Sequence, residues 1–169
     1  MSTSLGQAAS DVALYGHWIC PFATRVEFAL HQRGIDHELI DLPPSAVRGP
    51  DFVLPDEFVE HSPKLEIPLV RVGGDYLADS IPVLEWLENR VVAPALLPSD
   101  DADRRLVRDR MAWINRHAFR PMIGVYYGTD PDVISQASEA LADALAEMGR
   151  WTTETGWVAG AEPSLAEAV

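Results

Sequence analysis

The chain has 169 residues, of which 47% are hydrophobic and 23% are charged, a composition that is typical of globular proteins. This length is at the upper edge of one ordinary domain and suffices for two small ones. The formal net charge of -13 would repel phosphate backbones and anionic lipid surfaces, which argues against nucleic acid and membrane partners.

No apolar run approaches the roughly 20 residues that a membrane-spanning helix needs. The polar start, MSTSLGQAASD, lacks the basic and apolar regions of a secretory signal. We therefore expect a cytoplasmic protein that begins with a disordered tail over residues 1–10.

Residues 11–90 alternate strand and helix patterns. A helix starts at Pro21 with apolar residues at helical spacing, and Gly34 stands where it should end. Gly73 and Gly74, between two β-prone runs, predict a hairpin. The other expected elements are strands at 12–15 and 37–42, a short helix at 56–61, strands at 67–72 and 76–78, and a helix from Asp79-Ser80 to about residue 90.

Beyond residue 90 the pattern changes, and 91–99 are predicted to form a linker with two prolines. Two helices are expected next, from 101 to about 126 and over 131–152, because their apolar residues recur at helical spacing. Ser164 and Glu167 have the spacing of a capping box that announces a further helix. Because the sequence ends at Val169, we expect that this helix does not form, that the domain at 100–169 is truncated, and that the chain is weakly stable and prone to aggregate.

Cys20 is the single cysteine, so the chain cannot form an internal disulfide. It directly precedes Pro21, and proline is favoured at the first position of a helix. At a helix start, free N–H groups and the macrodipole favour the thiolate, which predicts a pKa below the usual value of about 8.5. The alternative is that Cys20 is an inert core residue. Ala23 stands where a dithiol protein has its second cysteine, so the site would be monothiol.

Three other positions in the sequence suggest binding chemistry. His17 would stabilise a thiolate if protonated, or is a solvated loop residue. Ile67-Pro68 opens a strand, where proline is rare because it cannot donate to the ladder, and this pair would fit a cis peptide. Asp79-Ser80 at a helix start would bind a carboxylate and an ammonium group, or would only cap the helix.

Four segments, in the correct order, resemble motifs of the cytosolic glutathione transferase family. They are YGHWICPFATRV around Cys20, SPKLEIPLV around Pro68, ADSIPVLEWL around Asp79, and GWVAGAEPSLAEA around the capping box. The first is most similar to the cysteine-type omega and lambda classes. The resemblance implies an α/β thioredoxin-like, glutathione-binding domain at 11–90, followed by an incomplete all-α domain at 100–169.

The same resemblance implies a role for each matched residue. Cys20 would be the catalytic thiol, with His17, Pro21 and Phe22 as accessory positions. The residues implied to bind glutathione are Ile67 through its backbone, Pro68 by shaping the site, and Asp79 with Ser80 at the γ-glutamyl end. The chain departs from the family pattern where Ser62 replaces an asparagine, Leu65 replaces a glycine, and Asp79 is one methylene shorter than the common glutamate.

We therefore predict an enzyme that transfers thiols with glutathione as co-substrate and with no metal or other cofactor. The thiolate of Cys20 would attack a glutathionyl mixed disulfide, and free glutathione would release it. Conjugation to a small electrophile is a further expected activity. Two alternatives stay open, namely a non-catalytic transferase-like protein-interaction module and an enzyme that uses another low-molecular-weight thiol.

The family resemblance also implies a homodimer for the complete protein. Tyr76, Trp86 and the pair Arg104-Arg105 are candidates for its surface. Trp86 is equally suited to a core position.

Overall fold

The computed structural model describes residues 12–90 and 95–169. The chain divides into two compact units, of which the first ends at Ala95 and the second begins at Leu96. The predicted tail at 1–10 and positions 91–94 of the predicted linker lie outside the described residues.

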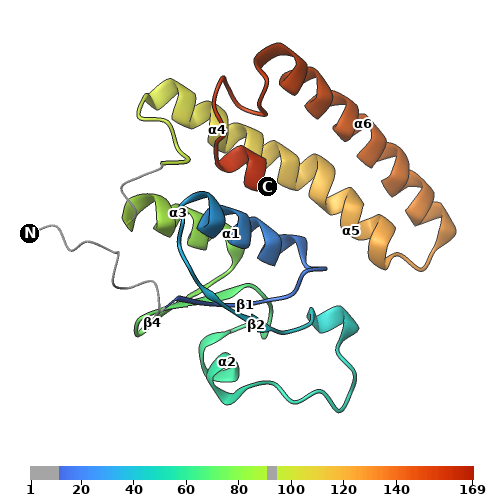
Figure 1. Ribbon diagram of the computed structural model, residues 1–169. Helices are drawn as coiled ribbons and strands as arrows, with labels where there is room; N and C mark the ends of the chain where they lie inside the picture. Colours follow the sequence, from blue (N-terminus) through green and yellow to red (C-terminus); the bar gives the residue numbers. More distant parts are fainter. Residues whose placement is uncertain (1–11, 91–94) are drawn as a thin grey trace, which may run out of the picture. The chain divides into compact units, whose positions relative to one another are not determined.

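The first unit is built on a four-stranded mixed sheet (Figure 1). Its spatial order is β2-β1-β3-β4, with β1 parallel to β2, antiparallel to β3, and β3 antiparallel to β4. The strands are β1 (Val12–Gly16), β2 (Glu38–Asp41), β3 (Leu69–Val72) and β4 (Asp75–Ala78). The strand predicted at 67–72 begins two residues later, at Leu69, because Pro68 has no N–H for the ladder.

Two helices, α1 (Pro21–Gln32) and α3 (Ser80–Arg90), cover one face of this sheet, and the short α2 (Asp56–His61) lies on the other (Figure 1). A 3-10 turn, Ser45–Val47, precedes α2. Gly34 follows α1 with φ of 62°, the left-handed conformation that ends helices, as predicted. Gly16 lets α1 approach β1, since a Cβ there would lie 3.0 Å from the Cβ of Ala23.

An ion pair with both side chains buried joins α1 to α3. The guanidinium of Arg33 contacts the carboxylate of Glu88, and Nη1 of Arg33 donates a 3.3 Å hydrogen bond to the carbonyl of Leu87. A buried charge needs such compensation, so removal of either partner would leave the other uncompensated. This pair therefore fixes how the two helices lie on the sheet.

The second unit is helical. Its elements are α4 (Asp101–Ile114), a π-turn (Asn115–Phe119), α5 (Arg120–Tyr127), α6 (Pro131–Thr155) and a 3-10 turn (Leu165–Ala168). The single helix expected from 101 to about 126 is thus interrupted, because Pro121 cannot donate to the carbonyl four residues earlier and its ring crowds that carbonyl. Within 12–90 and 95–169, no helix combines the length and the apolar character needed to cross a membrane.

The end of the chain packs against the helical unit. Ser164 and Glu167 form the predicted capping box, in which a Glu167 carboxylate oxygen accepts the backbone N–H of Ser164 at 2.6 Å. The capping box is followed by one 3-10 turn, Leu165–Ala168, rather than by an α-helix, and Leu165 in this turn is fully buried. Glu167 also accepts the N–H of Val158 at 2.6 Å, which ties the turn to the segment after α6.

The predicted fold class is confirmed. The first unit has a thioredoxin-like organisation, and a helical portion follows it. The helical portion has its own core, in which Ile114, Ala118, Ala144 and Trp151 are buried together. Arg110 adds a cation–π contact, with its Cζ 3.5 Å from the centroid of the Trp151 ring.

One carboxylate anchors α2 to the sheet. Glu57 accepts hydrogen bonds from the hydroxyls of Tyr15 on β1 and Tyr76 on β4, and Nε of Arg71 on β3 lies 3.5 Å from its Oε1. These hydrogen bonds lower the pKa of Glu57, with Arg71 acting in the same direction. The anion is therefore the form that holds α2 in place.

We predict that Glu57→Gln lowers the urea midpoint of unfolding at pH 7. Since the folded pKa of Glu57 is lowered, its stabilisation is present above the unfolded value of about 4.3 and is lost as pH falls through the folded value. The difference in urea midpoint between Glu57→Gln and the wild type should therefore become smaller at acid pH. Glu60→Gln, an exposed position on the same helix, is the control. A difference that stays constant from neutral to acid pH would contradict this account.

Candidate functional site

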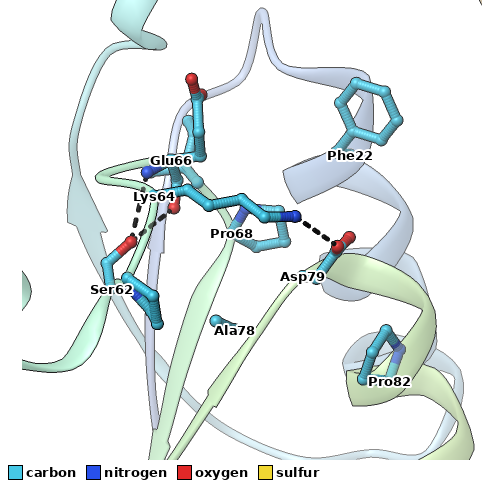
Figure 2. Close-up of a pocket in the computed structure, with 10 residues that line it drawn as sticks. Phe22, Ser62, Lys64, Glu66, Pro68, Ala78, Asp79 and Pro82 are labelled. Carbon is cyan, nitrogen blue, oxygen red and sulfur yellow. Dashed lines mark hydrogen bonds and ion pairs between the residues drawn. The ribbon is translucent and has the colours of Figure 1, made fainter.

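A cavity of about 470 Å³ opens in the first unit beside the start of α1 and the start of α3. It is largely apolar, with charged side chains at its edge (Figure 2). The residues that line it are Phe22, Ser62, Pro63, Lys64, Glu66, Ile67, Pro68, Ala78, Asp79 and Pro82. Phe22, Ile67, Pro68 and Asp79 are therefore brought together as the sequence predicts, whereas Cys20, Ser80, His17 and Pro21 do not line this cavity.

The loop before β3 forms one wall. The Ile67-Pro68 peptide is cis, as predicted, and the carbonyl of Pro68 accepts the backbone N–H of Asp79 at 3.2 Å. This hydrogen bond joins the cis-proline loop to the start of α3. The residues that flank the β3–β4 hairpin thus meet at the cavity.

The turn that precedes Pro68 contains Ser62 and Leu65, two of the departures from the family pattern. Ser62 is buried, and its Oγ accepts the N–H of Glu66 at 3.2 Å and donates to the carbonyl of Glu66 at 3.1 Å, so the hydroxyl closes the turn (Figure 2). Leu65 adopts φ of 54°, a conformation that costs a leucine more than the glycine it replaces. Arg48 supports it by donating from Nη1 to the Leu65 carbonyl at 2.6 Å.

Asp79 is held in an uncommon backbone conformation, with φ of 75°. Its Oδ1 accepts the N–H of Ser80 at 2.9 Å, and its Oδ2 lies 3.7 Å from Nζ of Lys64, which extends in front of Pro68 (Figure 2). Non-glycine residues with positive φ are strained and concentrate at ligand sites. The Asp79 carboxylate lies at the edge of the cavity and is exposed to solvent.

Ser80 occupies a different environment from Asp79. Its side chain is buried, with 1% of the residue exposed, and its Oγ accepts a hydrogen bond from Nη1 of Arg25 at 3.3 Å. The hydroxyl thus contacts the protein interior rather than the cavity. In this structure Ser80 positions the start of α3.

Arg25 is a buried cation behind the site, with 2% of the residue exposed. Burial lowers its pKa to about 10, while Asp79 and Cys20 act in the opposite direction. The guanidinium is therefore charged at neutral pH. Its Cζ lies 5.1 Å from the centroid of the Phe22 ring, so it also supports a cavity wall.

Cys20 is the N-cap residue of α1, and Pro21 occupies the first turn, as predicted. Its Sγ lies 4.0 Å from the carbonyl oxygen of Ile67, and 4% of the residue is exposed. The thiol belongs to a core cluster that includes Tyr15, Phe58 and Leu69.

The expected lowering of the Cys20 pKa is wrong. Burial raises the pKa of the thiol and outweighs the N–H groups of Ala23 and Phe22, which lower it. Glu66 raises the pKa further, whereas Arg25 lowers it. The helix start supplies the predicted donors, but desolvation of the anion is the larger effect.

The polar side-chain atoms of His17 and Tyr15 have partners other than the thiol. Nδ1 of His17 accepts the N–H of Ile19 at 3.2 Å, and its Nε2 lies 3.8 Å from Asp41. The hydroxyl of Tyr15 donates to Glu57 on the α2 side. The imidazole of His17 thus contacts Ile19 and Asp41, while its backbone carbonyl accepts the N–H of Cys20 at 2.9 Å.

Sequence analysis missed Lys64 and Glu66 at the cavity and Arg25 behind it. Lys64 is the only lysine of the chain, which has twelve arginines. A single lysine within the SPKLEIPLV segment could have indicated a functional position. Arg25 follows Cys20 by five residues in the first motif, but its burial depends on α3 and was not predictable from spacing.

The comparisons with known proteins agree with this architecture. Residues 19–90 match the family described as glutathione S-transferase, N-terminal domain. The glutathione transferase Omega 3C of Trametes versicolor has the same fold, with a TM-score of 0.79, 20% identity, and coverage of 94% of this chain and 66% of that chain. Residues 19–90 thus match the N-terminal domain of that family, and the solved structure shows a shared fold.

Several curated relatives have isomerase names. The chain is 30% identical to the maleylacetoacetate isomerase of Rattus norvegicus over 100 residues, which cover 59% of this chain and 45% of the relative. It is 32% identical to a maleylpyruvate isomerase of Ralstonia sp over 95 residues, which cover 56% of this chain and 43% of the relative. The chain spans about half the length of the curated relatives it matches.

We predict that Cys20 reacts slowly with iodoacetamide at pH 7 and that the rate rises with a midpoint above the usual thiol value of about 8.5. The reason is that burial disfavours the thiolate. The measurement is the alkylation rate against pH, with mass spectrometry of the modified chain and free glutathione as the reference thiol. A midpoint below that of an ordinary thiol would show that the helix start outweighs burial.

Proposed function

We propose that the cavity beside Pro68 binds glutathione and that the protein is a glutathione transferase whose chemistry uses the thiol of Cys20. The observation that carries this proposal is the placement of Lys64 and Asp79, of opposite charge, at the edge of an apolar cavity whose Ile67 contacts Cys20. Glutathione carries an ammonium group, carboxylates and a thiol, which match these three features.

The charged edge suits a zwitterionic ligand. Lys64 and Asp79 are both largely exposed and lie 3.7 Å apart, so their mutual attraction is weak in water. A ligand carboxylate at Lys64 and a ligand ammonium at Asp79 can replace this ion pair at little cost. In this proposal the carbonyl of Ile67, which lies 4.0 Å from Sγ of Cys20, accepts a hydrogen bond from the cysteinyl part of the ligand.

The proposed reaction is thiol–disulfide exchange in two steps. The Cys20 thiolate attacks the glutathionyl sulfur of a mixed disulfide, an S–S bond to glutathione forms, and the substrate leaves as its thiolate. A second glutathione thiolate then attacks this bond, which releases glutathione disulfide and regenerates the Cys20 thiolate. Since burial raises the pKa of Cys20, the rate should increase with pH.

A second candidate is thiol-dependent isomerisation, which the names of the Rattus norvegicus and Ralstonia sp relatives favour. There the thiol of bound glutathione would add to a double bond and leave again, and Cys20 would not form a covalent bond. A non-catalytic interaction module and the use of another low-molecular-weight thiol are the remaining alternatives. As part of the proposal, the protein is a homodimer.

Asp79→Asn should weaken binding of glutathione by on the order of tenfold, because the ammonium loses its carboxylate partner. Asparagine tolerates positive φ, so the backbone at this position should be retained. Isothermal titration with glutathione measures the effect. Asp75→Asn, on the exposed start of β4, is the matched control. Unchanged affinity in Asp79→Asn would place the ligand elsewhere.

Cys20→Ser should retain glutathione binding and lose turnover of a glutathionyl disulfide by about 100-fold or more, because a serine hydroxyl does not ionise near neutral pH. Binding is measured by titration and turnover by release of the substrate thiol. Full turnover of a chloronitrobenzene or maleyl substrate in the same variant would assign the activity to bound glutathione instead. Loss of binding together with turnover would mean that Cys20 is a structural residue.

A further inference from the structure

A second cluster of potential ligands lies on the first unit, at the C-terminal half of α1. It consists of Glu27 and His31, one helical turn apart, and His37, which follows the turn at Gly34 and directly precedes β2. One ligand atom from each of these three side chains lies within 4.8 Å of the other two. None of them lines the cavity near Pro68.

The distances are close to those of a metal site. Oε1 of Glu27 lies 3.8 Å from Nε2 of His31, which is longer than a good hydrogen bond. Ligand atoms on a tetrahedral zinc ion lie about 3.4 Å apart, given metal–ligand bonds of roughly 2.0–2.2 Å. Small rotations of the exposed His31 and the half-buried Glu27 and His37 side chains therefore suffice to complete the geometry.

The backbone prepares one histidine for ligation. Nδ1 of His37 lies 3.1 Å from the carbonyl oxygen of Ile35. A carbonyl only accepts, so Nδ1 carries the proton and Nε2 has the lone pair. A ring N–H that donates to a backbone carbonyl is the arrangement that orients histidine ligands in metalloproteins.

We propose that Glu27, His31 and His37 bind a divalent transition-metal ion of the Zn²⁺ class. Two imidazoles and one carboxylate are a ligand set that zinc uses, with water in the fourth position. The exposed carboxylates of Asp36 and Glu38 flank His37 in the sequence, and the chain has a net charge of -13, both of which favour a cation.

The ion would join the end of α1 to the start of β2. His31 lies ten residues beyond Pro21, which corresponds to about 15 Å along the helix, so the site is separate from Cys20 and its cavity. Because the three ligands come together only in the folded chain, binding should stabilise the folded state of this unit.

The test is equilibrium dialysis of the whole chain against ZnCl₂, with Co²⁺ absorption as a second readout. We expect one Zn²⁺ per chain and a higher thermal midpoint. With Co²⁺ we expect visible absorption bands but no near-ultraviolet charge-transfer band from a thiolate, and the absence of that band would exclude Cys20 as a ligand. His31→Ala, at a side chain that is 67% exposed, should fold normally and weaken binding by roughly tenfold or more. His117→Ala, at an exposed histidine of the helical unit, is the control.

Glu27→Gln and His37→Ala should weaken binding in the same way as His31→Ala. Unchanged Zn²⁺ affinity in His31→Ala, equal loss in His117→Ala, or a thiolate band with Co²⁺ would overturn the proposal. Circular dichroism of each variant separates loss of the ligand from loss of the fold.

Discussion

The buried positive charge of Arg25 is the constraint on which the arrangement of the site depends. A guanidinium with 2% of its residue exposed must be compensated by the groups around it. Ser80 accepts its hydrogen bond, and Asp79 and Cys20 hold its pKa up against burial. These contacts connect α1, with the cysteine at its start, to the first residues of α3. Replacement of this cation would therefore affect three parts of the site together.

Two opposing effects act on the thiol, and their balance decides the chemistry. The N–H groups at the start of α1 favour the thiolate of Cys20, but its place among Tyr15, Phe58 and Leu69 removes the water that an anion needs. Cys20 thus has the helix-start position expected of a catalytic thiol and the burial expected of a core residue. A ligand that brings its own polar groups to Ile67 would change the surroundings of the sulfur.

Features set by neighbouring residues were predictable from the sequence, and features set by distant contacts were not. Periodicity and Gly34 located α1, and the lack of an N–H in Pro68 marked the cis-proline loop. The raised pKa of Cys20 depends on side chains from separate strands and helices, which no local pattern shows. Likewise, Lys64 was visible as the only lysine, yet its approach to Asp79 joins two segments that no local sequence pattern brings together.

The π-turn at Asn115–Phe119 has a consequence for how the helical unit tolerates change. Each residue advances an α-helix by about 100°, so a turn that takes in one extra residue rotates everything after it by that amount. The stripe that α4 buries and the one that α5 presents to α6 are therefore out of phase with each other. Deletion of a single residue here would do more than shorten the helix, because it would turn α5 about its own axis and exchange the side chains that face α6. The number of residues in this segment therefore sets the orientation of α5 relative to α4. We expect its length to tolerate less change than the identity of its residues.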